Sequence, residues 1–144
     1  MKVGIASDHA GYDLKVEIKK YLEEVKKYEV IDFGAFSSES SDYPDYAHPL
    51  AKAIEKGDFR FGISVCGSGN GINMTLNKHR NIRSALCWIP EIASLARQHN
   101  DANVCALPAR FISFSEAKEI INAFFTATFE GGRHQKRVDK ISEL

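Results

Sequence analysis

The sequence has no excess of charge, no closely spaced cysteine pair and no long apolar run. Nineteen Lys and Arg residues balance nineteen Asp and Glu residues among 144, so the formal net charge at pH 7 is zero. This balance argues against a nucleic-acid-binding or membrane-surface protein. No stretch approaches the roughly 20 apolar residues of a membrane span, and the apolar run before Asp8 and His9 is too short for a secretory signal.

Disulfide and metal frameworks are also missing. The three cysteines are odd in number and widely spaced, which excludes a C-x-x-C pair and favours reduced thiols in the cytoplasm. The five histidines form no H-E-x-x-H or other compact ligand spacing, so we expect no metal site: they are His9, His48, His79, His99 and His134.

Short apolar runs alternate with amphipathic segments along the whole chain. This alternation predicts an α/β fold whose five-stranded parallel sheet is covered by helices on both faces, and a single domain over 1–144 without linker or repeat. Strands are expected at 2–6, 29–33, 61–65, 82–87 and 103–107. Helices are expected at 14–25, 47–56, from about 72, 91–98, 115–126 and 133–143.

Local signals refine these boundaries. The Ser- and Asp-rich stretch 34–46 is predicted to be a loop, which places Pro49 in the first turn of the next helix, and Gly57 is expected to end that helix. Ser115 is the predicted N-cap of the helix that follows it.

The segment CGSGNG at 66–71 is the strongest chemical feature. Its three glycines allow a sharp turn that directs backbone N–H groups at one spot, which suits an anion; the alternative is a tight turn that needs positive φ. Ile72 stands where a dinucleotide fingerprint needs glycine, no Walker lysine follows, and no G-x-S-x-G motif is present. Cys66, directly after a strand and beside a helix start, is a candidate base or nucleophile, whereas Cys87 and Cys105 are expected to be buried hydrophobes.

Other polar residues indicate a functional site only when they are considered together. Asp8 and His9 follow the first strand, where a helix-capping role is the simpler alternative. His99, by itself, is typical of a surface or capping position. Arg133 and Arg137 share one helix face and suit a phosphate, although, taken by themselves, they are better explained as a solvated basic helix end.

Together, five motifs give the chain a resemblance to a known family. SDHAG at 7–11, DYPDYA at 42–47, CGSGNG at 66–71, RQHNDANV at 97–104 and EGGRHQKRV at 130–138 resemble, in order and over nearly the whole chain, the ribose-5-phosphate isomerase B family. This family also includes galactose-6-phosphate and allose-6-phosphate isomerases.

The resemblance implies a three-layer, Rossmann-like α/β/α domain and an aldose–ketose isomerase that needs no metal and no cofactor. It also implies a homodimer or homotetramer with its active site at the subunit interface. It implies that Cys66 is the base, that His99 opens the sugar ring beside Asp8, and that Ser68 passes a proton between oxygens. Implied substrate-binding residues are His9, Tyr43, Gly67, Gly69, Asn70, Gly71, Asn100, Arg110, Arg133 and Arg137.

Two alternatives remain open at this stage. The first is an isomerase of another sugar phosphate, such as allose 6-phosphate or galactose 6-phosphate, because pocket length decides substrate size. The second is a sugar-phosphate-binding protein without catalysis, which the presence of both Cys66 and His99 disfavours, since binding alone requires neither a base nor a ring-opening group.

Overall fold

Five parallel strands form one sheet in the computed structural model, which describes residues 1–144. Their order across the sheet is β2-β1-β3-β5-β4. The strands are β1 (Lys2–Ser7), β2 (Glu29–Asp32), β3 (Phe61–Cys66), β4 (Ser84–Leu86) and β5 (Val104–Pro108). The predicted five-stranded parallel sheet is therefore confirmed.

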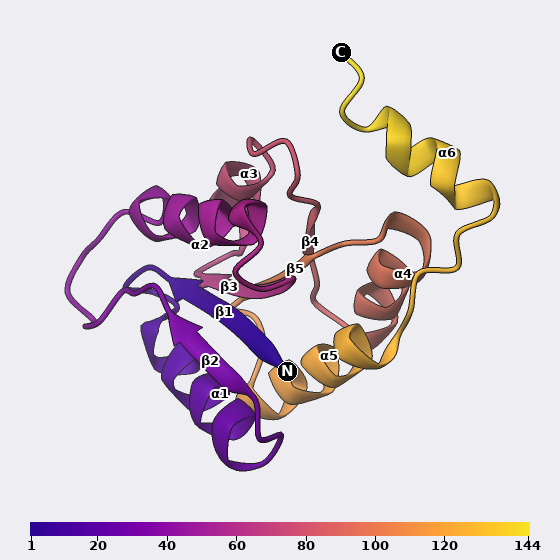
Figure 1. Cartoon of the computed structure of the whole chain (residues 1–144). Coiled ribbons are helices and arrows are strands. Elements are labelled where there is room, and N and C mark those ends of the chain that lie inside the picture. Colours follow the sequence, from indigo (N-terminus) through magenta and orange to yellow (C-terminus); the bar gives the residue numbers. More distant parts are fainter.

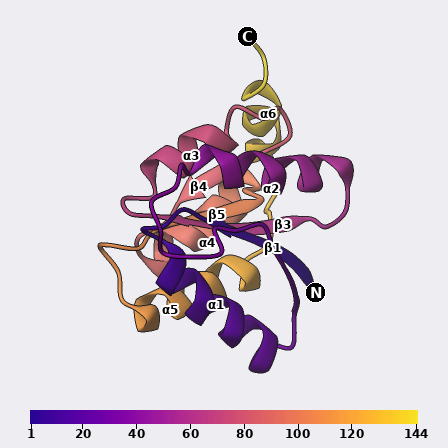
Figure 2. The same ribbon diagram turned by 90° about the vertical axis from the view of Figure 1, so that its left-hand side faces the viewer.

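Helices cover both faces of this sheet and complete three layers (Figures 1 and 2). Helices α1, α4 and α5 pack on one face, and α2 and α3 pack on the other. Their bounds are α1 (Tyr12–Glu24), α2 (Pro44–Lys56), α3 (Asn70–Leu76), α4 (Pro90–Asn100), α5 (Phe114–Thr126) and α6 (Arg133–Lys140).

The central strands are buried on both faces because each face has its own apolar core. The larger core joins β1, β3 and β5 to α1, α4 and α5, with Phe124 and Ile18 among its fully buried side chains. The smaller core lies under α2 and α3 and includes Leu50 and Ile72. Burial on both sides explains why these strands are nearly continuous apolar runs in the sequence.

Helix α2 begins three residues earlier than expected, which corrects the predicted position of Pro49. Pro44 occupies the first turn, where its missing N–H costs nothing, and Pro49 lies inside the helix. Gly57 ends α2 in the left-handed conformation, at φ 89°, as expected.

The N-cap of α5 is Ser113, so the prediction of Ser115 is wrong. The Ser113 side chain accepts a hydrogen bond from the Glu116 N–H, and the Glu116 carboxylate accepts one from the Ser113 N–H. This reciprocal pair is a capping box, whose S-x-x-E spacing is visible in the sequence. Smaller boundary shifts make Cys66 the last residue of β3, place His99 inside α4, begin α3 at Asn70 and end α6 at Lys140.

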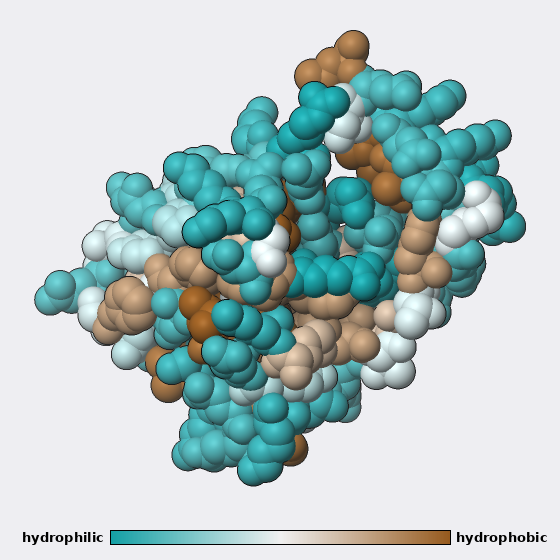
Figure 3. All heavy atoms as spheres, in the orientation of Figure 1, coloured by the Kyte–Doolittle hydropathy of each residue, from teal (hydrophilic) through white to brown (hydrophobic).

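Helix α6 projects from the layered body in both ribbon views (Figures 1 and 2) and packs on α4. The space-filling view shows it as a separate lobe with a hollow between it and the body (Figure 3). None of the helices has the length and apolar character needed to cross a membrane.

Candidate active site

The candidate site lies beside β1, where the order in which strands are added to the sheet reverses. The connection after β1 leads outward to β2, whereas β3 continues the sheet on the other side of β1. In open parallel sheets, ligands bind beyond the carboxyl ends of the strands at such a switch point. Asp8 directly follows β1 and Cys66 ends β3, and the pairing of Ser7 with Val65 brings these two turns side by side.

A cavity of about 330 Å³ opens between these turns. Its volume suits a small ligand. It is lined by Asp8, His9, Ala10, Tyr43, Cys66, Gly67, Ser68, Gly71 and Arg110. A hollow of about 390 Å³ between α1 and α5 is larger, but it lies between two helices, away from the carboxyl ends of the strands, and none of the predicted site residues lines it.

The three thiols occupy different environments. Cys66 lines the cavity while being 4% exposed, and its carbonyl accepts a hydrogen bond from the Ala109 N–H at 2.9 Å. Cys87 and Cys105 are fully buried. A hydrogen bond with Cys87, together with burial, raises the pKa of Cys105 well above its usual range. Of the three thiols, only Cys66 has access to a ligand.

The three glycines of the 66–71 segment are required for two different reasons, backbone conformation and close packing. Only Gly69 adopts a positive φ, 78°, so it alone needs glycine's conformational freedom. A Cβ on Gly71 would lie 2.4 Å from the Tyr43 ring, and one on Gly67 would lie 3.2 Å from the Arg110 guanidinium. These two glycines let Tyr43 and Arg110 close over the cavity.

His9 is held by a residue that sequence reasoning missed. Its Nδ1 lies 3.1 Å from both the backbone N and the backbone O of Ser41, and its own N–H donates to the Ser41 Oγ at 3.1 Å. Because Ser41 engages Nδ1, Nε2 is the ring nitrogen left for a ligand. No local signal pairs residues 32 positions apart, so only the tertiary structure reveals this contact.

Asp8 both lines the cavity and supports the turn after β1. Its Oδ1 accepts a hydrogen bond from the Gly11 N–H at 3.1 Å. Ser68 similarly accepts from the Asn70 N–H at 3.2 Å. Gly69 and Asn70 themselves do not line the cavity.

Four other predicted site residues lie on α4 and α6, toward the opposite edge of the sheet, where the strands begin: they are His99, Asn100, Arg133 and Arg137. Helix α4 runs antiparallel to the strands, so His99 and Asn100 in its last turn sit just before β5 begins. At about 3.3 Å per residue, the length of β3 alone spans about 16 Å between the two edges. One chain therefore brings Cys66 and Asp8 together but does not bring His99, Arg133 or Arg137 to the same cavity.

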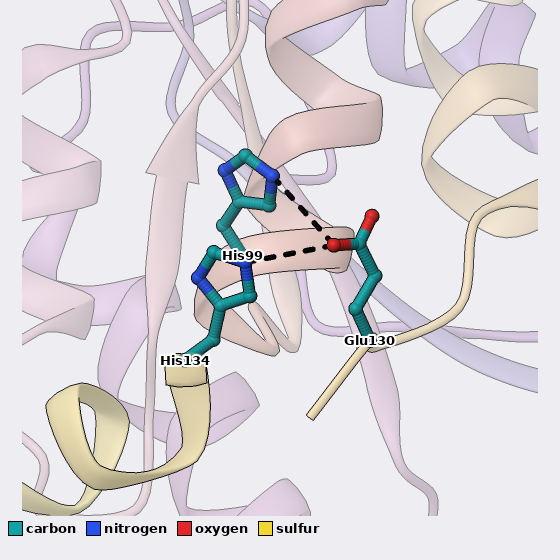
Figure 4. A group of neighbouring side chains, drawn as sticks. All are labelled: His99, Glu130 and His134. Atoms are coloured by element: carbon teal, nitrogen blue, oxygen red, sulfur yellow. Dashed lines mark ion pairs between the residues drawn. The ribbon is translucent and has the colours of Figure 1, made fainter. Parts of the chain in front are cut away.

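Beside α4, His99 lies close to two side chains from other segments, Glu130 and His134 (Figure 4). The His99 and His134 rings stack at a centroid distance of 4.2 Å, and Glu130 Oε1 lies 4.0 Å and 3.5 Å from their Nε2 atoms. Burial, with the charges of His99 and Arg133, lowers the pKa of His134 below its ordinary value. Glu130 was absent from the sequence-based site, and both Arg133 and Arg137 are exposed on α6.

The cavity of this three-layer α/β fold is bordered by a thiol, a carboxylate and a guanidinium group, from Cys66, Asp8 and Arg110. Such a site is typical of proteins that act on small polar ligands. The model of the family described as Ribose/Galactose Isomerase matches residues 3–141. The chain belongs to this family, and the resemblance found in the sequence is confirmed.

Similar proteins within this family include several ribose-5-phosphate isomerases B. The chain is 45% identical to ribose-5-phosphate isomerase B of Escherichia coli over 143 residues, covering 99% of this chain and 95% of that protein. It is similar to the structure of ribose-5-phosphate isomerase B from Clostridium thermocellum, with a TM-score of 0.97, 46% identity and coverage of 99% and 96%. The enzyme from Mycoplasma genitalium, solved with bound ribulose-5-phosphate, matches with a TM-score of 0.92, 42% identity and coverage of 98% and 93%.

Proposed function

We propose that this protein interconverts D-ribose 5-phosphate and D-ribulose 5-phosphate, a step of the non-oxidative pentose phosphate branch. The observation that carries the proposal is Cys66 beside Asp8 in a small polar cavity at the switch point of the sheet. Its family membership and near-complete match to ribose-5-phosphate isomerase B relatives support the choice of substrate.

Proton transfer by Cys66 is the central step. Its thiolate removes the proton from C2 of the open-chain aldose, and the electron pair forms the C1–C2 double bond of an enediolate. The same proton returns to C1, while a proton passes between O2 and O1 with help from Ser68, which gives the ketose. Backbone N–H groups of Gly67, Ser68 and Gly71, the loop residues that line the cavity, stabilise the negative oxygen, a contribution of roughly 3–4 kcal/mol per well-placed donor in other enzymes.

Ring opening and phosphate binding require groups from the other edge of the sheet. His99 exchanges protons with the ring oxygen and the anomeric hydroxyl, and Asn100 orients substrate hydroxyls. Arg133 and Arg137 bind the phosphate together with His9 and Arg110, because paired guanidinium groups suit a phosphate oxyanion. Anchoring the phosphate holds C1 and C2 in register with Cys66.

The separation of these groups supports a site made by two chains. The length of the strands keeps His99 of one chain from reaching a small sugar held at Cys66 of the same chain. A second copy that offers α4 and the projecting α6 would complete the cavity, so we propose at least a homodimer, with residues 1–144 as one unit and α6 as its phosphate-binding arm. The three unpaired cysteines support a reducing, cytoplasmic setting.

An isomerase of another sugar phosphate is the second candidate, because the family described as Ribose/Galactose Isomerase covers more than one sugar. Tyr43, at the end of the 34–43 segment, borders the cavity, so its ring would limit the length of the sugar that fits. Allose 6-phosphate and galactose 6-phosphate are the substrates to compare.

The decisive experiment measures turnover of the three sugar phosphates, without added metal, by wild type and Cys66→Ala. We expect turnover of ribose 5-phosphate that the substitution abolishes. Cys105→Ala is the matched control, since it removes a thiol outside the cavity and should retain turnover. Turnover of only a hexose phosphate would transfer the proposal to that sugar, and an active Cys66→Ala variant would refute the role of Cys66.

A further inference from the structure

Three potential metal ligands from separate segments converge beside α4. His99 comes from the last turn of α4, His134 from the first turn of α6, and Glu130 from the connection between α5 and α6. Their ligand atoms all lie within 4.8 Å of one another, and both Nε2 atoms face the same carboxylate oxygen (Figure 4). At 3.5 Å and 4.0 Å, neither contact is a hydrogen bond.

The donor set and spacing fit a tetrahedral cation. Two imidazole nitrogens and one carboxylate oxygen are ligands that Zn²⁺ prefers, and bonds of 2.0–2.1 Å place tetrahedral ligands about 3.4 Å apart. The His134–Glu130 distance of 3.5 Å already meets this requirement. The His99 nitrogen, at 4.0 Å, must approach by about half an ångström.

The stacked rings require one adjustment. A metal ion lies near the plane of each imidazole that binds it, whereas the two rings are stacked with 12° between their planes. One ring must therefore turn about its Cβ–Cγ bond. The His99 side chain is 37% exposed and has room to turn, and Glu130, at 52%, leaves the ion open to solvent.

Nearby charges limit the affinity. Arg133 and Arg137, on the same helix as His134, repel a cation, and the single Glu130 carboxylate offsets only part of this repulsion. We therefore expect reversible binding with one coordination position left to water rather than a permanent structural metal.

We propose that His99, His134 and Glu130 form a binding site for a divalent transition metal ion of the Zn²⁺ type. Binding would tie α6 to α4 and occupy the Nε2 lone pair of His99. Bound metal would also inhibit the isomerase, because His99 could no longer exchange protons in ring opening. This consequence rests on the proposed function. The ion is an inhibitor here and takes no part in the reaction.

The first test measures Zn²⁺ binding directly by competition with a chromophoric chelator, in the Cys66→Ala background so that this thiol cannot bind the metal. We expect one ion per chain and a visible Co²⁺ spectrum typical of tetrahedral coordination. Glu130→Gln and His134→Gln should each weaken binding by at least about tenfold. Glu130 is exposed, so its variant should fold normally even if the buried His134 proves less tolerant.

A second histidine pair provides the matched control. His48 Nδ1 and His79 Nε2 lie 2.7 Å apart, and His79 Nδ1 lies 2.9 Å from Glu55 Oε1. His79→Gln dismantles that pair and should leave Zn²⁺ affinity unchanged. Absence of Zn²⁺ binding, or loss of binding in His79→Gln but not in Glu130→Gln, would overturn the proposal.

Activity supplies an independent readout. Zn²⁺ should lower the turnover of the wild-type protein, a chelator should restore it, and Glu130→Gln should be active but less sensitive to the ion. Undiminished sensitivity in Glu130→Gln would refute the inhibitory site. A protein that binds Zn²⁺ as expected but turns over no sugar phosphate would refute the proposed function and leave the metal site intact.

Discussion

At the scale of single residues, environment decides what each of the three cysteines can do. Cys66 borders an open cavity, while Cys87, directly after β4, and Cys105, in β5, have no exposed surface. Thiol reactivity requires both access and the thiolate form. The hydrogen bond with Cys87, followed by burial, raises the pKa of Cys105 and keeps this thiol protonated.

We predict that iodoacetamide labels Cys66 alone in the folded protein and all three cysteines in denaturant. Peptide mass spectrometry measures the labelling of each thiol, and turnover should fall in step with labelling at Cys66. Equal labelling rates for Cys66 and Cys105 would contradict this account of the buried pair.

The raised pKa of Cys105 also predicts a pH dependence of stability. The folded protein retains this proton to higher pH than the unfolded chain, so the unfolded state releases it first. This contribution is complete below about pH 8.5, the usual value for a free cysteine, and falls as the pH rises further. Urea unfolding between neutral and alkaline pH should show the decrease, and Cys105→Ala should reduce it.

Gly71 is a second residue whose neighbours define its role. In Gly71→Ala the new methyl group would meet the Tyr43 ring at 2.4 Å and push it from the cavity wall. We expect kcat/KM to fall roughly tenfold, about 1.4 kcal/mol of transition-state binding. In a Tyr43→Ala background the same substitution should cost little, because the clash is gone. Additive effects would indicate that Gly71 acts independently of Tyr43.

At the scale of elements, helix ends depend on short side-chain patterns that resemble one another. Ser113 and Ser115 both precede an amphipathic run, but only Ser113 has glutamate three residues later and forms the capping box. Pro44 and Pro49 present the same choice at α2, and the helix begins at the earlier proline. Each error came from preferring one local signal over another signal nearby.

Two serine variants test the assigned cap. Ser113→Ala should lower the free energy of unfolding by about 1 kcal/mol, because the first turn of α5 loses a hydrogen-bond acceptor. Ser115→Ala should change it by no more than a few tenths, since no cap bond is lost. Thermal unfolding distinguishes them, with an expected decrease of roughly 3 °C for Ser113→Ala alone. Equal destabilisation would argue against the capping box.

At the scale of the whole molecule, the two halves of the proposed site lie at opposite edges of one sheet. Co-expression of Cys66→Ala with His99→Asn tests whether two chains share a site. In the proposed dimer, we expect each homodimer to be inactive, whereas a mixed dimer combines the intact Cys66 of one chain with the intact His99 of the other. Random pairing in a dimer should restore about one quarter of wild-type turnover. If both residues acted within one chain, no mixture would recover activity.

Local sequence patterns were enough to predict the alternation of strands and helices, the parallel sheet and the chemical types of the turns after β1 and β3. These features depend on periodicity and on residues a few positions apart, so they are local. Its motifs also pointed correctly to the family.

Which of these turns meet depends on the three-dimensional arrangement of the strands. Strand order brings Asp8 to Cys66, and the fold of the 34–43 segment brings Ser41 to His9. The antiparallel path of α4 carries His99 to the far edge, where Glu130 and His134 join it. These contacts link residues tens of positions apart through sheet register and helix packing, which leave no periodic trace in the local sequence.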